Sequence, residues 1–170
     1  PFVRRYFPGR RMALLRLADR WQGFMVRPGF TTDIGWHSLD RLRFVNRQKG
    51  SGTRLLLDHH LSLSGIDPMS VAGYQREVTT HLAVACAVLA AEADVGLGVR
   101  SVADALGLAF VPLCLEPFDL LMDRHTVEDP RVAALQHIVR SPEFASRLKL
   151  LGGYDSQHSG EILWEGSNDR

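Results

Sequence analysis

The stretch RFVNRQKGSGTRLLLD, residues 43–58, predicts a short strand, a glycine-rich turn and the start of a helix. The first N–H groups of a helix lack intrahelical partners and carry partial positive charge. Gly50 and Gly52 let the backbone approach a ligand closely. Ser51 and Thr53 add hydroxyl groups that can cap the helix or donate to an oxyanion. The residue types therefore suit a phosphate or another tetrahedral oxyanion.

Two cations strengthen this interpretation. Arg47 and Lys49 bring full positive charge to the turn, and Arg47 can contact an oxyanion through two N–H groups. A plain loop with an N-cap would use the same Gly-Ser-Gly-Thr residues, because short motifs recur without a ligand. The step of four residues from Arg47 to Ser51 favours the anion site. The turn is not a P-loop, since the Gly-Lys-Ser/Thr ending is absent.

Outside this stretch, expected strands alternate with expected helices. The strands are expected at 12–17, 21–26 (or one bent strand across both), 42–46, 93–99, 108–115 and 118–122, and an extended piece at 71–77. The helices are expected at 53–63, 80–91, 101–107, 131–140 and 142–151, with a short one near 38–42. This order predicts an α/β fold with a mostly parallel sheet.

Ligands bind beyond the carboxyl ends of the strands in such sheets. The loop 47–53 lies at such an end, and so do the loop carrying Thr79 and Thr80 and the loop 98–101. We expect these helix-opening loops to converge on one site. Thr79 and Thr80 fit a plain N-cap equally well. For Arg54 we expect an ion pair with Asp58, four residues later on the same helix.

Composition limits the function classes. A chain of 170 residues suits one domain or two small lobes, and a net charge of +1 predicts no general attraction to nucleic acid. Arginines gather in residues 1–20, which we interpret as a solvated basic face rather than a nucleic-acid arm, because no DNA-binding motif accompanies them. Cys86 and Cys114 lie in apolar runs and are expected to be buried thiols. No Cys, His and Asp spacing predicts a metal site.

No segment reaches the length of a membrane span, and no signal peptide is visible. We expect a cytoplasmic location, or a periplasmic one if a signal peptide has been removed. The sequence starts at Pro1, which leaves a preceding domain open.

Four segments in order carry a resemblance to a known family: RFVNRQKGSGTRLLLD (43–58), GYQREVTTHLAVACAV (73–88), ADVGLGV (93–99) and GLAFVPLCLEPFDLL (107–121). Together they resemble the type II periplasmic-binding-protein-like domain of the molybdate-binding type, which is often fused to helix-turn-helix regulators. The pattern Arg-x-x-x-Ser-Gly-Thr is also similar to the anion loop of periplasmic phosphate- and tungstate-binding proteins.

The resemblance implies two lobes that close on a ligand. Residues 42–107 would form the second lobe with the anion loop, and residues 1–41 and 108–170 a partial first lobe with the hinge crossings. The first two βα units of the family's first lobe are absent from this sequence, which implies a lobe truncated at its N-terminus. Val99 and Phe118 stand where relatives often carry Tyr, so molybdate itself is in question.

The leading hypothesis is a non-catalytic domain that binds or senses an oxyanion in a prokaryotic transcription regulator or uptake system. Molybdate or tungstate is the first candidate, and sulfate or phosphate is the second. The domain needs no cofactor. The expected partners are the anion and a fused or separate DNA-binding module, and two chains sharing a sheet would form a homodimer. One alternative is an enzyme with a phosphate-binding loop on the same fold, and another is a ligand-free interaction domain. The expected ligand-binding residues are Arg47, Ser51, Gly52, Thr53, Thr79 and Thr80.

Overall fold

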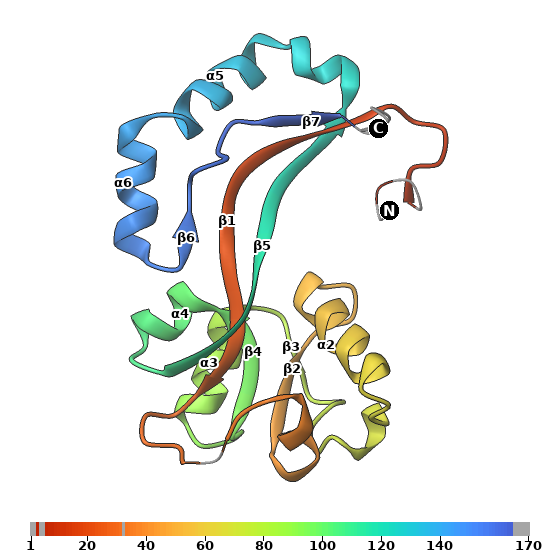
Figure 1. Ribbon diagram of the computed structural model, residues 1–170, viewed down its shortest axis with the longest axis vertical. Helices are drawn as coiled ribbons and strands as arrows, with labels where there is room; N and C mark the ends of the chain where they lie inside the picture. The colour runs from red at the N-terminus through yellow and green to blue at the C-terminus, as the bar shows by residue number, and fades with distance from the viewer. Residues whose placement is uncertain (1–2, 4–5, 32, 165–170) are drawn as a thin grey trace. The chain divides into compact units, whose positions relative to one another are not determined.

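The computed structural model describes every residue except 1–2, 4–5, 32 and 165–170 (Figure 1). The chain divides into two compact units. Unit 1 comprises residues 1–20 and 115–170, and unit 2 comprises residues 21–114. Two strands of 15 residues each, β1 (Met12–Val26) and β5 (Ala109–Asp123), contribute residues to both units.

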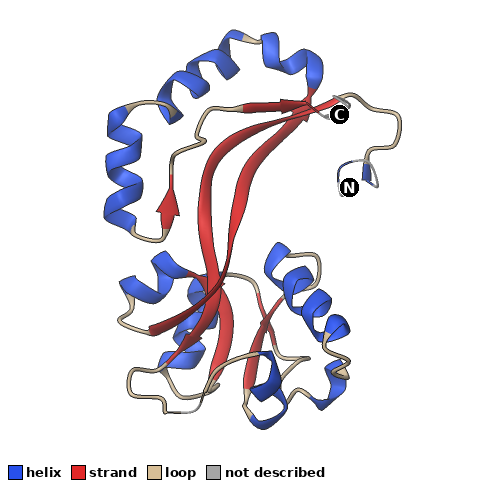
Figure 2. Ribbon diagram, viewed as in Figure 1, coloured by secondary structure: helices blue, strands red, loops and turns tan. Residues whose placement is uncertain are grey.

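Unit 2 is built on a mixed sheet (Figure 2). The strands β2 (Phe44–Arg47), β3 (Glu77–Val78) and β4 (Val95–Val99) lie in the order β3-β2-β4, and β2 is parallel to both neighbours. The second half of β1 then pairs antiparallel with β4, with Gln22 opposite Val99. The α/β class is confirmed, and the sheet is mixed: the pairs β2-β3 and β2-β4 are parallel, whereas β1 pairs antiparallel with β4.

The helices of unit 2 follow the strands as their sequences predict. Ser51 caps α2 (Gly52–Leu63), Thr80 caps α3 (His81–Leu89), and α4 (Arg100–Ala105) follows β4 directly. In each of the two capped helices the hydroxyl oxygen accepts an amide N–H from the third helical residue, which is the usual N-cap contact. Two 3₁₀ turns, η1 (Trp36–Arg41) and η2 (Pro68–Ser70), complete the unit.

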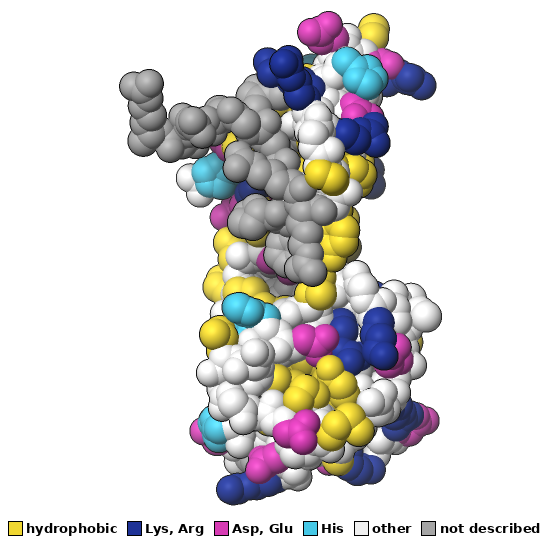
Figure 3. Space-filling view, turned by 90° about the vertical axis from the view of Figure 1, so that its right-hand side faces the viewer, with side chains coloured by type: hydrophobic (Ala, Val, Ile, Leu, Met, Phe, Trp, Pro, Cys, Tyr) yellow, Lys and Arg dark blue, Asp and Glu magenta, His cyan; other side chains and the backbone are white. Residues whose placement is uncertain are grey.

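Both hydrophobic clusters of the described core belong to unit 2. The first packs α2 and η1 on one side of the sheet through Phe24, Phe44, Leu39, Leu57 and Leu61. The second packs α3 and α4 on the other side through Met25, Val45, Val84, Val88 and Ala103. Some apolar side chains still reach the surface between charged ones (Figure 3). The parallel core of the sheet is thus covered by helices on both faces.

Unit 1 combines the first half of β1 and the second half of β5 with the C-terminal elements. These are η3 (Arg124–Glu128), α5 (Pro130–Val139), α6 (Pro142–Leu151), β6 (Tyr154–Asp155) and β7 (Ile162–Trp164). Both β6 and β7 pair antiparallel with β1. The helices α5 and α6 begin at proline after Asp129 and Ser141, whose side chains accept amide hydrogen bonds as expected for caps.

Ion pairs link β1 to β5 in unit 1. Arg16 Nε lies 2.5 Å from Asp119 Oδ1, and both side chains are about 15% exposed. Arg20 Nη2 lies 2.6 Å from Glu116 Oε1, and its guanidinium sits 4.4 Å from the centre of the Phe118 ring. These pairs fix which residues of the two long strands face each other.

Two strand predictions were wrong. The segments 108–115 and 118–122 form one strand, because β5 lies at the end of the sheet, where Pro117 removes no needed hydrogen bond. For the segments 12–17 and 21–26, the alternative of one strand across both is confirmed, since Asp19 and Arg20 continue β1 and pair with β6. The expected extended piece at 71–77 is a turn at Gly73 (φ +93°) followed by the two residues of β3.

Two expected helices differ in detail from the structure. The helix expected at 101–107 is α4, which begins at Arg100 with Val99 as a cap that makes no side-chain hydrogen bond. The helix expected at 80–91 is α3, which buries only the face with Val84, Ala85, Ala87 and Val88. Its other face exposes Leu82, Cys86 and Leu89, so Cys86 is not the buried thiol that was expected.

Candidate functional site

The loop from β2 to α2 presents open backbone N–H groups. The Ser51 amide is used, since it donates to the Gln48 carbonyl over 3.2 Å. Among the described residues, the amides of Gly52 and Thr53 donate to no protein group. A Cβ atom placed on Gly52 would meet nothing within 4 Å, so the space around this residue is open. This helix start can therefore accept an anion without displacing a protein contact.

Arg47 connects this loop with the loop before α3. Its Nη2 donates to the Thr79 carbonyl over 3.0 Å, and its Nε donates to Gln48 Oε1 over 3.2 Å. Arg47 is half-buried, whereas Thr79 and Thr80 are exposed. The structure thus brings together the two loops that the sequence places at neighbouring strand ends.

The hydroxyl groups of the two caps have unused capacity. Ser51 Oγ accepts from the Arg54 amide over 3.2 Å, and Thr80 Oγ1 accepts from the Ala83 amide over 3.0 Å. A hydroxyl that accepts one hydrogen bond still has its own proton to donate. Ser51 and Thr80 can therefore cap their helices and donate to an anion simultaneously.

Thr53 has a different environment from the other predicted residues. It is only 3% exposed, and its Oγ1 accepts from Gln22 Nε2 over 3.1 Å. Gln22 is fully buried on β1 and was not singled out as a ligand-binding residue. A glutamine between the apolar residues 21–26 was the available signal, because a buried amide needs a polar partner. This contact fixes Thr53 beneath the first turn of α2.

A charged cluster supports the same turn from the side. Arg54 is 2% exposed and pairs with Asp58 over 2.9 Å, which confirms the predicted pair. It also pairs with Glu77 over 2.8 Å and lies 4.1 Å from the centre of the Tyr74 ring. Tyr74 donates its hydroxyl proton to Asp58 over 2.8 Å. Arg54 thereby ties α2 to β3 across 23 residues of sequence.

This cluster perturbs its own ionisable groups. Burial and the hydrogen bond to Asp58 raise the pKa of the Tyr74 hydroxyl. Burial opposes the Arg54 charge, but the hydrogen bonds with Tyr74 and Asp58 outweigh it and the pKa of the guanidinium is raised. Arg54 therefore stays charged, and its guanidinium pairs with Asp58 and Glu77 rather than facing a ligand.

The third expected loop, 98–101, contributes less. Arg100 is exposed and pairs with Asp104 over 3.3 Å. The described residues contain no group of three His, Cys, Asp or Glu side chains that could hold a metal ion. His60 instead stacks on Trp36 with ring centres 4.3 Å apart. No helix among the described residues has the length and apolar character needed to cross a membrane.

Comparisons with known proteins agree with this architecture. Protein YvgK of Bacillus subtilis is 34% identical over 168 residues, which are 97% of this chain and 54% of that protein. A Clostridium pasteurianum protein encoded in the 5′ region of a 2Fe-2S ferredoxin gene is 38% identical over 112 residues, which are 65% of this chain and 99% of that protein. The chain thus spans about half the length of YvgK.

Solved structures of low sequence identity share the fold. The ancestral amino acid-binding protein AncCDT-1, a precursor of cyclohexadienyl dehydratase, matches with a TM-score of 0.59 at 13% identity, over 89% of this chain and 62% of that one. A Corynebacterium glutamicum OxyR C206 mutant matches with a TM-score of 0.60 at 15% identity, over 85% of this chain and 46% of that one. A family model described as the PBP superfamily domain matches residues 1–140. The chain therefore belongs to the PBP superfamily, with the type II periplasmic-binding-protein-like fold.

Proposed function

We propose that this chain is a non-catalytic domain that binds a small anion at the starts of α2 and α3. The observation that carries the proposal is the hydrogen bond from Arg47 to the Thr79 carbonyl, which joins the end of β2, just before the α2 loop, to the loop before α3. The open amides of Gly52 and Thr53 and the hydroxyl protons of Ser51 and Thr80 supply the donors.

The energetics favour several convergent contacts over one. A helix terminus contributes roughly 0.3–1 kcal/mol to an exposed anion and up to about 2 kcal/mol to a partly buried one. Charge-assisted hydrogen bonds from amides and a guanidinium each add about 1.5–3 kcal/mol. Several such contacts must therefore act together, because micromolar affinity needs about 8 kcal/mol of binding free energy after the cost of association.

The ligand that we favour is a tetrahedral oxyanion: molybdate or tungstate first, then sulfate or phosphate. The order of the sequence motifs and their resemblance to molybdate-binding domains support this choice. Carboxylates of amino acids are the second candidate, because AncCDT-1 and a Thermotoga maritima protein named ArgBP share the fold and are named for amino acid binding or arginine binding. A carboxylate would use the same amides and guanidinium.

Calorimetry with the intact protein tests the proposal. Molybdate, tungstate, sulfate, phosphate and a set of amino acids are titrated separately, and we expect heat from the anions that fit. The Arg47→Met variant should bind at least roughly tenfold more weakly, because it loses one charge-assisted contact. Arg41→Met is the matched control, since the Arg41 side chain is 84% exposed on η1.

Absence of heat with every anion at millimolar concentration would refute the proposal. Equal affinities of Arg47→Met and Arg41→Met would also refute it, because the guanidinium would then have no role. Turnover of a phosphorylated substrate would instead support the alternative of an enzyme on the same fold.

Binding would act by shifting an equilibrium between conformations that differ in affinity for the anion. In a regulator, that shift would change the state of an attached DNA-binding module. In an uptake system, it would change contact with a partner protein. The neighbour OxyR is consistent with a regulator but shares the fold only. A homodimer and a cytoplasmic location complete the proposal.

A further inference from the structure

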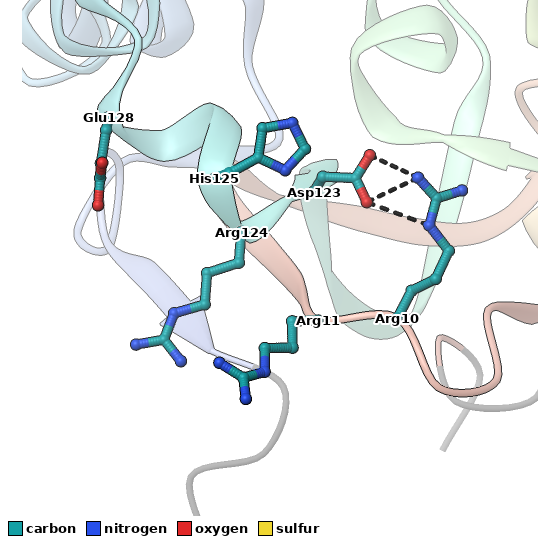
Figure 4. Close-up of a pocket in the computed structure, with 6 residues that line it drawn as sticks. All are labelled: Arg10, Arg11, Asp123, Arg124, His125 and Glu128. Carbon is teal, nitrogen blue, oxygen red and sulfur yellow. Dashed lines mark hydrogen bonds and ion pairs between the residues drawn. The ribbon is translucent and has the colours of Figure 1, made fainter.

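A hollow of unit 2 lies at the end of α2, about 18 Å along the helix from the proposed anion site. Residues of η1 and of the segment 64–70 line this α2-end hollow, and none of the described lining residues is Lys or Arg. Its volume is about 640 Å³, which is in the range of pockets for small organic ligands. A hollow of unit 1 differs in charge, because three arginines line it, and one of them, Arg10, pairs with Asp123 over 2.6 Å (Figure 4).

The end of α2 gives the α2-end hollow a partial negative charge. Ser64 is the C-cap, and the amides of Gly65 and Ile66 turn back to donate to carbonyls of the last helical turn over 3.3 and 2.9 Å. Among the described residues, no protein group donates to the carbonyl oxygens of Ser64 and Gly65. A Cβ atom placed on Gly65 would meet nothing within 4 Å, so the space beside it is open. Open carbonyls at a helix C-terminus favour a cation.

Two carboxylates that line the hollow, those of Asp40 and Asp67, add full negative charge. Asp67 Oδ1 accepts the Met69 amide over 2.9 Å, which leaves most of the accepting capacity of the carboxylate unused. Within the described part of the chain, no Lys, Arg or His side chain lies within ion-pair distance of Asp67. Asp40 has Arg41 3.8 Å away, but the Arg41 side chain is 84% exposed, and such a surface pair contributes little. Both carboxylates can therefore pair with a bound cation.

An apolar wall stands beside this negative charge. Trp36 and Ile66 line the hollow and pack against the first hydrophobic cluster of unit 2. Trp36 is held in place by His60, with ring centres 4.3 Å apart, and by the edge of Phe24 at 5.0 Å. Burial and the neighbouring His59 lower the pKa of His60, so its imidazole is neutral at pH 7 and does not repel a cation. The hollow thus combines a fixed apolar surface with oxygen acceptors.

We infer that the α2-end hollow binds a small organic cation, an amine that carries an apolar group. Its ammonium group pairs with Asp40 and Asp67 at the end of α2, because its three N–H groups match carboxylate and carbonyl oxygens. Its apolar group lies against Trp36. A metal ion fits less well, since the described residues hold no group of three His, Cys, Asp or Glu side chains suited to one. His37, which also lines the hollow, lies 3.5 Å from Asp33.

The test is a titration of the intact protein followed by ¹⁵N–¹H NMR. The probe is 2-phenylethylamine, and 3-phenylpropionate is an anion of similar size that lacks the ammonium group. The amide of Gly65 and the indole N–H of Trp36 report the α2-end hollow, whereas the amide of Gly52 reports the anion site. We expect saturable shifts of Gly65 and Trp36 with the amine and none with 3-phenylpropionate.

Charge-removing variants identify the groups that hold the ammonium. Asp40→Asn and Asp67→Asn should each weaken amine binding roughly threefold, and the double variant roughly tenfold, as expected for partly exposed ion pairs. Asparagine at position 67 keeps an oxygen that can accept the Met69 amide, so the turn at η2 is retained. Asp104→Asn is the matched control, because it removes the same charge from α4, where the side chain is 42% exposed and pairs with Arg100.

Four results would overturn the inference. One is the absence of saturable shifts at Gly65 and Trp36 with millimolar amine. Another is equal binding of 3-phenylpropionate, because apolar contact alone would then explain it. An equal loss with Asp104→Asn would assign the binding to net charge, and displacement of the amine by millimolar calcium chloride would replace the organic cation by a metal ion. None of these results bears on anion binding at the start of α2, which is tested separately.

Discussion

Arg54 shows how one side chain can organise the candidate site without touching a ligand. It is nearly fully buried and holds Asp58 on its own helix and Glu77 on β3. Removing either acidic partner would leave the buried guanidinium with less compensation, although Asp58 and Glu77 themselves stay partly solvated. The orientation of the first turn of α2, and with it the open amides, depends on this residue.

Gly73 lies where the backbone leaves no room for a side chain. Its φ of +93° is unfavourable for any side chain, and a Cβ there would lie 2.0 Å from the Phe44 carbonyl oxygen. We predict that Gly73→Ala lowers the free energy of unfolding by about 2–4 kcal/mol, through strain and displacement of β2. Urea denaturation of the intact protein measures this change.

Gly29→Ala is the matched control for this substitution. Its φ is +77°, but a Cβ there would meet nothing within 4 Å. Gly29→Ala should lower the free energy of unfolding by only about 1 kcal/mol, because only the backbone conformation disfavours the side chain. If the two variants lose the same stability, the close approach of Phe44 is not the cause.

The beginnings of β2 and β4 are joined by Asp94. Its carboxylate accepts from the Arg43 side chain and backbone amide at 2.6–3.1 Å, and Arg27 lies 3.7 Å away. The hydrogen bonds from Arg43 hold the pKa of this carboxyl below its ordinary value of 3.8. A depressed pKa in the folded state means that this stabilisation is complete above about pH 4 and is lost as the pH falls further.

We therefore predict that Asp94→Asn destabilises the protein by about 1–2 kcal/mol at pH 7 and makes its loss of stability below pH 4 shallower. Urea midpoints between pH 2.5 and pH 7 measure both effects. Asp40→Asn should change neither, since Asp40 is exposed and its ion pair with Arg41 is long, at 3.8 Å. If Asp94→Asn loses stability below pH 4 as steeply as the unmodified protein does, the Asp94 carboxylate is not the cause of that loss.

Helices and strands whose sequence patterns lie within the element could be predicted from the sequence. Those that depend on contacts between residues far apart in the sequence could not. The strand β4 and the helices α2, α5 and α6 are as expected, because their apolar runs and N-caps are adjacent in sequence. The continuity of β5 through Pro117 depends on its place at the end of the sheet, which no local pattern shows.

The candidate site divides in the same way. The caps Ser51 and Thr80 and the Arg54–Asp58 pair follow from local spacing. Gln22 and Glu77 reach the site only through the pairing of strands, so their roles needed the structure. The ligand-binding roles of Arg47, Ser51, Gly52, Thr53, Thr79 and Thr80 stay predictions, as does the molybdate-binding subtype.

At the scale of the whole molecule, the apolar core is unevenly distributed. Both described clusters lie in unit 2, whereas α6 buries Leu148 but leaves Leu150 88% exposed and Leu151 57% exposed. Local stability follows the density of buried apolar contacts. Unit 1 should therefore open at a lower free energy than unit 2.

Hydrogen exchange followed by mass spectrometry measures this difference. We predict that the amides of α5 and α6 exchange roughly tenfold or more faster than those of β2 and β4, relative to their intrinsic rates. Equal protection in the two units would show that they open together as one cooperative body.

The division of the chain also has a consequence for biosynthesis. Unit 2 is one uninterrupted stretch, residues 21–114, while unit 1 needs its last 56 residues, 115–170, before its strands can pair. Because a ribosome releases polypeptide from the N-terminus, the inserted unit can collapse while the rest is still being translated. The surrounding unit cannot form until residues 115–170 have been synthesised, so residues 12–20 of β1 emerge early and stay without their partner strands on the nascent chain.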